Sequence, residues 1–279
     1  MNEYDNIIVL DIWSSFGSFS KAFSNTGGLL TYLIPPKTTV VGMIAAILGY
    51  EFSDVIEEVD GIKKYKIEEL FDIKISIRAF FDLKVKRVVF NSHYGNEPNL
   101  LNVRQDVLLD PYYKIYLSFP GKFHEKEKEF LEKIKSNKTV YNLYMGRNEF
   151  FLNYEFKEYL EDVNCKNIYD KSNDKIYGIL DKSKIKNVDL NSQTATTIFG
   201  KMSEDISKLA SHYEYVVKDY PVRRHDFVNF EYRPISFYAA QDDNTYFTNL
   251  ILKEDLELEE EDKKIELFNI GEDKWISMI

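Results

Sequence analysis

Two short segments of the sequence carry side chains that suit phosphate binding. Lys37, Thr38 and Thr39 follow a pair of prolines, and Arg147 follows Gly146 in the stretch YMGRNEF. A helix start offers free amides to an anion, and an arginine can hold a phosphate through two parallel hydrogen bonds. We interpret both segments as candidate phosphate contacts. Helix capping by Thr38 and an ordinary strand-end turn with a surface Arg–Glu pair are the alternative interpretations.

The first segment is not a nucleotide-binding P-loop. That motif places a glycine directly before the lysine, so that backbone amides surround the phosphates. Pro36 precedes Lys37 in this chain, and proline has no amide hydrogen to donate. The pattern therefore excludes this class of nucleotide-binding enzyme.

Other catalytic and metal-binding patterns are weak or missing. No two of the four histidines have a metal-ligand spacing such as H-x-x-x-H, and there is no G-x-S-x-G motif. Cys165 is the single cysteine, which excludes a disulfide or a cysteine zinc site within the chain. His93 lies beside Tyr94 in a basic segment. It is either an exposed loop histidine or a general acid or base for RNA cleavage. We expect neither a metal nor a cofactor.

The overall charge argues against a free-standing nucleic-acid binder. The 279 residues carry a formal net charge of -10, whereas affinity for phosphate comes from clustered lysine and arginine. Any nucleic-acid contact must therefore use a local basic patch. The N-terminus has no basic signal-peptide region and no run approaches the ~18 apolar residues of a membrane span, so we expect a soluble, cytoplasmic protein.

The elements that would position these segments alternate in type. Periodicity predicts the order strand, helix, strand, strand, helix, strand, which is the RRM-like or ferredoxin-like βαββαβ plan of the α+β class. In the first helix, Thr38 is the expected N-cap and Gly49 the left-handed C-cap. Gly42, Ala45 and Ala46 are small enough to let that helix lie close to a sheet. The ranges are 7–12, 38–49, 71–81, 112–119, 122–137 and 139–146.

A long basic connection separates the second and third strands. Connections beyond ~12–15 residues are uncommon in compact domains and are often functional. From 83 to 104 this one carries four basic residues against Glu97 alone, and its two apolar stretches could pair as a hairpin. We expect a first domain over 1–150, with this insertion at about 83–110, and a smaller β-rich domain over 151–279. The basic cluster at 220–227 is expected to balance nearby acids.

Taken together, these segments resemble the CRISPR-associated Cas-five family. The resemblance covers roughly residues 4–152 and rests on FGSFSKAFSN, TYLIPPKTTVVGMIAAILG, NVRQDVLLDPYYKIYL and LYMGRNEFF in this order. It implies an RRM-like body with a protruding thumb hairpin. It also implies a Cascade subunit that binds the 5′ handle of the crRNA. Its partners would be the backbone subunit, the large subunit and nearby target DNA, in an antiviral ribonucleoprotein complex.

The resemblance also assigns candidate RNA contacts. They fall in the loop after the first strand, at the first helix start, in the thumb and on the glycine–arginine turn. Carried onto this chain, the contacts are Lys21, Phe23, Lys37, Thr38, Thr39, Lys86, Arg87, Arg104, Gly146, Arg147 and Asn148.

Two other functions stay open from the sequence. The type I-C branch of the family cuts precursor RNA without metal, using a Tyr, a Lys and a His. Tyr50 has the place of that tyrosine, but the nearest Lys and His are Lys122 and His124, which are not adjacent. The resemblance to the type I-B branch therefore favours a non-catalytic subunit. A ferredoxin-like module in an unrelated assembly is the third hypothesis.

Overall fold

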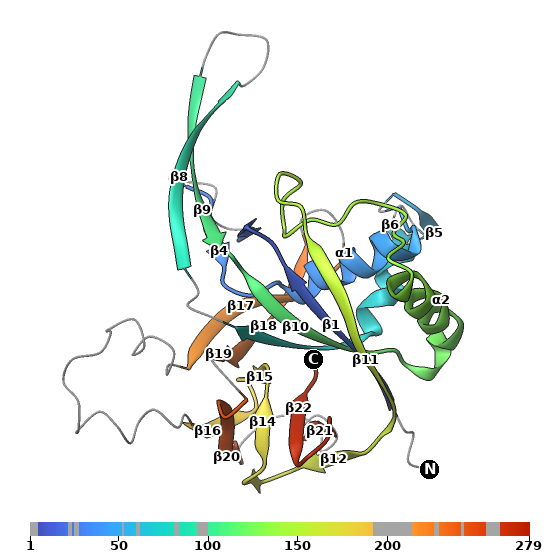
Figure 1. Cartoon of the computed structure of the whole chain (residues 1–279), viewed down its shortest axis with the longest axis vertical. Coiled ribbons are helices and arrows are strands. Elements are labelled where there is room, and N and C mark those ends of the chain that lie inside the picture. The colour runs from blue at the N-terminus through green and yellow to red at the C-terminus, as the bar shows by residue number, and fades with distance from the viewer. Residues whose placement is uncertain are drawn as a thin grey trace, which may run out of the picture.

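A computed structural model shows a mixed α+β protein, as the sequence predicts. Helices and strands alternate in the first half of the chain, and strands dominate the second (Figure 1). No helix among the described residues is long and apolar enough to cross a membrane. The structure describes residues 5–21, 24, 28–51, 53–59, 62–80, 84–93, 100–191, 214–225, 229–240, 243–254 and 263–279.

The central sheet has five strands in the order β11-β1-β10-β7-β19. All neighbours in it are antiparallel except β19, which runs parallel to β7. Helices α1 and α2 share one hydrophobic core with this sheet, and η1, a short 3₁₀ helix, completes it. Their bounds are β1 Asp5–Trp13, α1 Lys37–Leu48, η1 Lys66–Asp72, β7 Lys74–Phe80, β10 Tyr112–Ser118, α2 His124–Lys135, β11 Asn153–Val163 and β19 Ala239–Ala240.

The predicted fourth strand at 139–146 is wrong. In the structure this segment crosses the end of α1, where the Tyr141 amide donates to Ala46 O at 3.1 Å. It then turns back on itself, and the Leu152 amide donates to Leu143 O at 3.0 Å. The edge of β1 is instead occupied by β11, which pairs with it over most of its length. The segment contains bends and a single bridge, between Tyr144 and Phe151, so it joins no sheet.

Helix α1 confirms the predicted core face but not its expected start. Val41, Ile44 and Leu48 are buried, and Gly49 ends the helix with a φ of 88°. Pro36 is the N-cap residue and no side chain caps the helix, so the capping role expected for Thr38 is wrong. Of the three small residues expected to let this helix lie close to the sheet, Ala45 is buried in the shared core, whereas Gly42 and Ala46 line a cavity.

The basic connection forms a long antiparallel hairpin that projects from the body (Figure 1). Its strands are β8 Lys84–His93 and β9 Leu100–Leu109, paired from Lys84↔Leu109 to His93↔Leu100. At its base, β2 Phe16–Gly17 pairs with β9, and near its middle Leu29 forms a parallel bridge to Gln105. The small strands β3 Phe19–Ser20 and β4 Thr31–Tyr32 pair beside it. The loop after the first strand is therefore tied to the hairpin.

The second half of the chain is rich in strands, and these belong to more than one sheet. One sheet has the order β12-β21-β22-β14-β20-β13, with β16 also on β20, and another has the order β15-β18-β17. The bounds are β12 Cys165–Ile168, β13 Lys171–Ser172, β14 Lys175–Tyr177, β15 Leu180–Asp181, β16 Ile185–Asn191, β17 Tyr215–Arg224, β18 Phe230–Phe237, β20 Tyr246–Leu252, β21 Ile265–Asn269 and β22 Lys274–Ser277. A separate hairpin joins β5 Val55–Val59 to β6 Ile62–Tyr65, and a short turn of 3₁₀ helix, η2 Gly121–Phe123, precedes α2.

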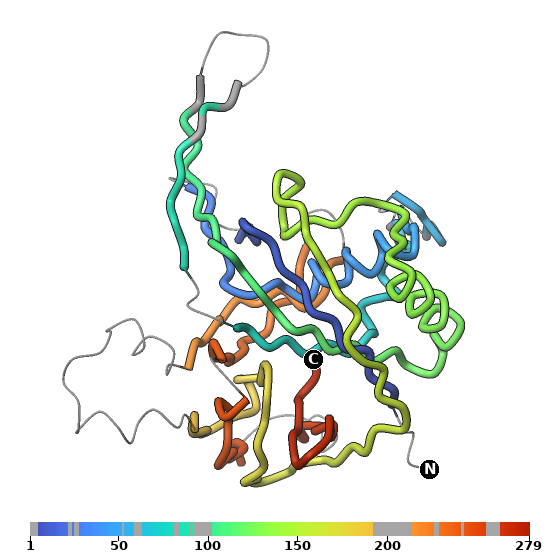
Figure 2. Tube along the Cα trace, viewed as in Figure 1, coloured from blue at the N-terminus to red at the C-terminus, as the bar shows by residue number. Residues whose placement is uncertain are grey.

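Strands from beyond residue 150 complete the first half instead of standing apart from it. β11 and β19 extend the central sheet, and β17 returns to lie against α1 (Figure 2). On the sheet face away from the helices, Val9 and Tyr116 pack with Tyr177 and Phe268. The central sheet is thus covered by helices on one face and, over part of the other face, by C-terminal strands.

Candidate nucleic-acid interface

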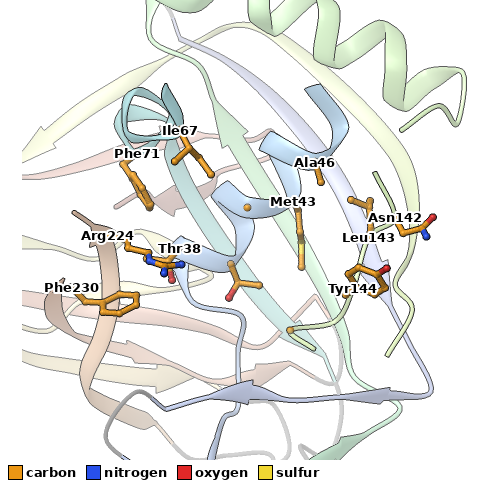
Figure 3. A pocket seen from close by; sticks show the side chains of 13 residues that line it. Thr38, Met43, Ala46, Ile67, Phe71, Asn142, Leu143, Tyr144, Arg224 and Phe230 are labelled. Atoms are coloured by element: carbon orange, nitrogen blue, oxygen red, sulfur yellow. The ribbon is translucent and has the colours of Figure 1, made fainter. Parts of the chain in front are cut away.

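A cavity of about 330 Å³ runs along the exposed side of α1 (Figure 3). Its walls come from three separate parts of the chain: the helix with η1, the turn before β11, and the β17–β18 hairpin. The lining residues are Thr38, Thr39, Gly42, Met43, Ala46, Ile67, Phe71, Asn142, Leu143, Tyr144, Gly146, Arg224 and Phe230. The fold therefore brings the predicted Thr38, Thr39 and Gly146 to one place.

The turn at Gly146 is held against the loop after β1. The Ser18 amide donates to Met145 O at 3.0 Å, and the Met145 amide donates to Phe150 O at 2.7 Å. Gly146 has a φ of 90°, and a Cβ built there would stand 2.1 Å from Ser18 O. Only glycine allows this close approach, so Gly146 has a structural role at the rim of the cavity.

Arg147 and Asn148 lie on the outside of the same turn. The Arg147 Nε and Nη2 donate to the two carboxylate oxygens of Glu149 at 3.3 and 3.2 Å, which holds the pKa of Glu149 below its usual value. Asn148 is exposed. The Arg–Glu pair that the alternative interpretation expects is therefore present, and a phosphate would have to compete with Glu149 for Arg147.

Lys37 points into the protein, away from the surface expected for an RNA contact. Its side chain is buried, and Nζ donates to the backbone oxygen of Ile279 at 2.9 Å. Burial first, and then the nearby Arg223 and Arg233, lower the pKa of Lys37 to about 7. The structure thus corrects this candidate: its ammonium group joins the first helix to the last described residue.

The loop candidates lie beside the hairpin. Lys21 donates its amide to Leu30 O at 2.9 Å, and its Nζ stands 5.2 Å from the centre of the Tyr32 ring. The amide of Leu29, the residue before Leu30, donates to Arg104 O at 2.8 Å. The loop that holds Lys21 is therefore tied to the middle of the hairpin. Phe23 lies outside the described residues.

The hairpin distributes its three candidates over two faces, because successive strand residues alternate in direction. Arg87 makes two hydrogen bonds to Asp106 across the hairpin, at 2.7 and 3.2 Å. Arg104 is exposed on this same face, opposite Val89. Lys86 lies on the other face, where it lines an apolar cavity of about 740 Å³ together with Phe16. Arg104 is thus the hairpin candidate best placed for a ligand.

The three residues of the alternative nuclease each contact a different acid, with Lys122 on Asp72. The Tyr50 hydroxyl donates to Glu69 at 3.1 Å, and its ring faces Lys66 and Lys126. Burial raises the pKa of Tyr50, opposite to what a proton acceptor at this site needs. His124 Nδ1 lies 3.8 Å from Glu127 Oε2, on α2. Across the described ranges, no group of three or more His, Cys, Asp or Glu could hold a metal ion.

The sequence interpretation missed the contribution of the β17–β18 hairpin. Arg223 does balance an acid, because it donates to Asp72 at 2.6 Å. The adjacent Arg224 lines the α1 cavity, with its guanidinium 5.4 Å from the centre of the Phe230 ring. The arginine pair was the available signal, but only tertiary packing shows that its second member faces α1.

Comparisons with known proteins agree with the motifs. Residues 7–135 match the family described as CRISPR-associated protein (Cas_Cas5). No curated protein matches the sequence. Similar solved structures include a Cas protein, 17% identical over 51% of this chain with a TM-score of 0.35, and this chain spans 57% of that protein's length.

Two further structures cover more of the chain. A chain of a CRISPR RNA-guided surveillance complex is 12% identical over 88% of this chain and 91% of its own length, with a TM-score of 0.43. A CRISPR protein from Archaeoglobus fulgidus is 13% identical over 98% of both chains, with a TM-score of 0.45. The resemblance that the sequence motifs indicate is confirmed by the family match: residues 7–135 carry the signature of the Cas-five family.

Proposed function

We propose that this chain is a non-catalytic subunit of a type I CRISPR Cascade complex that binds the 5′ handle of the crRNA. The observation that carries the proposal is the family match over residues 7–135. This range contains the start of α1 and the whole projecting hairpin. Both are places where the sequence indicates phosphate contacts.

The elements can be assigned to the parts of such a subunit. The four strands β11-β1-β10-β7 with α1 and α2 would be the RRM-like body, and β8 with β9 would be the thumb. The projection of this hairpin from the body supports the assignment (Figure 1). The thumb would separate the handle from the guide and so interrupt pairing with target DNA.

The RNA path follows from the positions of the accessible candidates. Arg104 marks the middle of the hairpin and Lys21 the loop beside it, while Thr38, Thr39 and Gly146 mark the α1 cavity. Phosphate contacts of this kind fix the register of a bound strand, and splayed bases offer faces and edges for recognition. Other, more acidic faces would meet the backbone and large subunits in the cytoplasm.

One incubation separates the three hypotheses. The full chain is mixed with labelled repeat RNA in EDTA, and the RNA is analysed for binding and for cleavage. We expect bound, intact RNA, with weaker binding after Arg104→Ala but not after Lys128→Ala, a control on exposed α2. Cleavage that Tyr50→Phe abolishes would assign the endoribonuclease activity. A folded chain that neither binds nor cuts the RNA would favour an unrelated assembly.

A further inference from the structure

We propose that the cavity on α1 holds one unstacked nucleotide of the bound RNA, with Arg224 and Phe230 as one wall. The proposal rests on the proposed function and extends it. It gives the second half of the chain a part in RNA recognition, although the family match ends at residue 135.

The floor of the cavity is a helix face with little side-chain bulk. Thr38, Gly42 and Ala46 are spaced by four residues, so they lie above one another on one side of α1. A Cβ built at Gly42 would meet no atom within 4 Å. The space above this glycine is therefore open and is not a packing contact with the sheet. A flat group could lie directly against the helix backbone there.

The walls supply the surfaces that bases use. Arg224 and Phe230 are register partners at the end of the β17–β18 hairpin, and they line the cavity together. Tyr144 and Asn142 stand on the opposite side, beyond Met43 (Figure 3). Splayed RNA bases stack on aromatic rings and guanidinium planes and are read by polar side chains at their edges. This cavity offers all three.

Charge and size favour a nucleotide over a protein segment. The described residues that line the cavity include Arg224 and two threonine hydroxyls but no carboxylate, in a chain whose formal net charge is -10. Such a lining is complementary to an anionic ligand with an apolar ring. A volume of about 330 Å³ lies at the lower end of the range for small-ligand sites, which suits one nucleotide.

Gly42→Leu tests the cavity without removing any protein contact. The leucine fills the open space, and loss of a helix-interior glycine should leave the melting temperature unchanged or higher. We expect the affinity for labelled repeat RNA, measured by fluorescence anisotropy, to fall about tenfold, the scale of one stacked base. Gly121→Leu is the matched control, because a Cβ at Gly121 also meets nothing within 4 Å and this residue does not line the cavity.

An abasic scan of the same RNA identifies the occupant. Removing the base at one position should weaken binding of the RNA to the natural chain about tenfold. The same abasic RNA should bind Gly42→Leu almost as well as the intact RNA binds that variant, because both changes remove the same contact. Phe230→Ala should show the same coupling to that position. Independent losses at every position would overturn the proposal.

The remaining outcomes separate this inference from the function on which it rests. Tight RNA binding by Gly42→Leu would overturn the nucleotide site and leave the handle-binding function standing. If Gly42→Leu binds RNA tightly but no longer co-purifies with the backbone or large subunit, the cavity is assigned to a protein partner. A folded natural chain that binds no repeat RNA would overturn both proposals.

Discussion

Gly146 has a structural role at the rim of the α1 cavity, whatever ligand the cavity holds. Its φ of 90° and its approach to Ser18 O leave no room for a side chain. We expect Gly146→Ala to lower the free energy of unfolding by about 1–3 kcal/mol, because the alanine needs both a left-handed backbone and a shift of the neighbouring loop. Urea denaturation measures this loss, and an equally stable variant would contradict the assigned role.

The neighbouring Arg147 is held by a partner that a phosphate must replace. Glu149 accepts two hydrogen bonds from its guanidinium. Glu149→Gln should strengthen binding of repeat RNA a few-fold, because it removes both a competing acceptor and a negative charge. Arg147→Ala should weaken binding. Anisotropy titrations of the two variants compare these effects, and equal affinities for both would exclude Arg147 from the RNA contact.

At the scale of elements, the hairpin makes different predictions for its two arginines. Arg104 is exposed, whereas Arg87 is already paired with Asp106 across the strands. Arg104→Ala should reduce the slope of log Kd against log salt by about 1, as expected when one phosphate contact is lost. Arg87→Ala should change this slope less. A larger change with Arg87→Ala would show that the pair opens when RNA binds.

Local sequence patterns predicted the individual elements better than their partners. The helix predicted at 122–137 is confirmed by α2, which buries Phe130 and Ile134, and the strand predicted at 112–119 is confirmed by β10. The strand predicted at 139–146 is wrong because a local pattern does not specify which segment pairs with the edge of β1. β11, which has a more polar sequence, pairs with β1 instead.

At the scale of the whole molecule, Lys37 links α1 to the C-terminal strands through Ile279. Its pKa falls from 10.5 to about 7 on folding. Between these values the unfolded chain binds the extra proton, so this group makes stability rise with pH, by at most about 1.4 kcal/mol per pH unit. The free energy of unfolding of the natural chain, minus that of Lys37→Met, should therefore rise between pH 7 and about 10, as measured by urea denaturation. A constant difference would show that Lys37 stays charged in the folded protein.

The sequence alone determined most helix and strand segments of the first half, the basic hairpin and the family resemblance, because these depend on local periodicity, charge and motif order. It did not determine that β11 closes the sheet, that Lys37 is buried, or that Gly42 faces open space. Nor did it place Arg224 opposite Tyr144. These features depend on contacts between residues far apart in the chain. The cavity forms where the turn before β11 and the β17–β18 hairpin meet α1 and η1, and no local pattern in these segments encodes that arrangement.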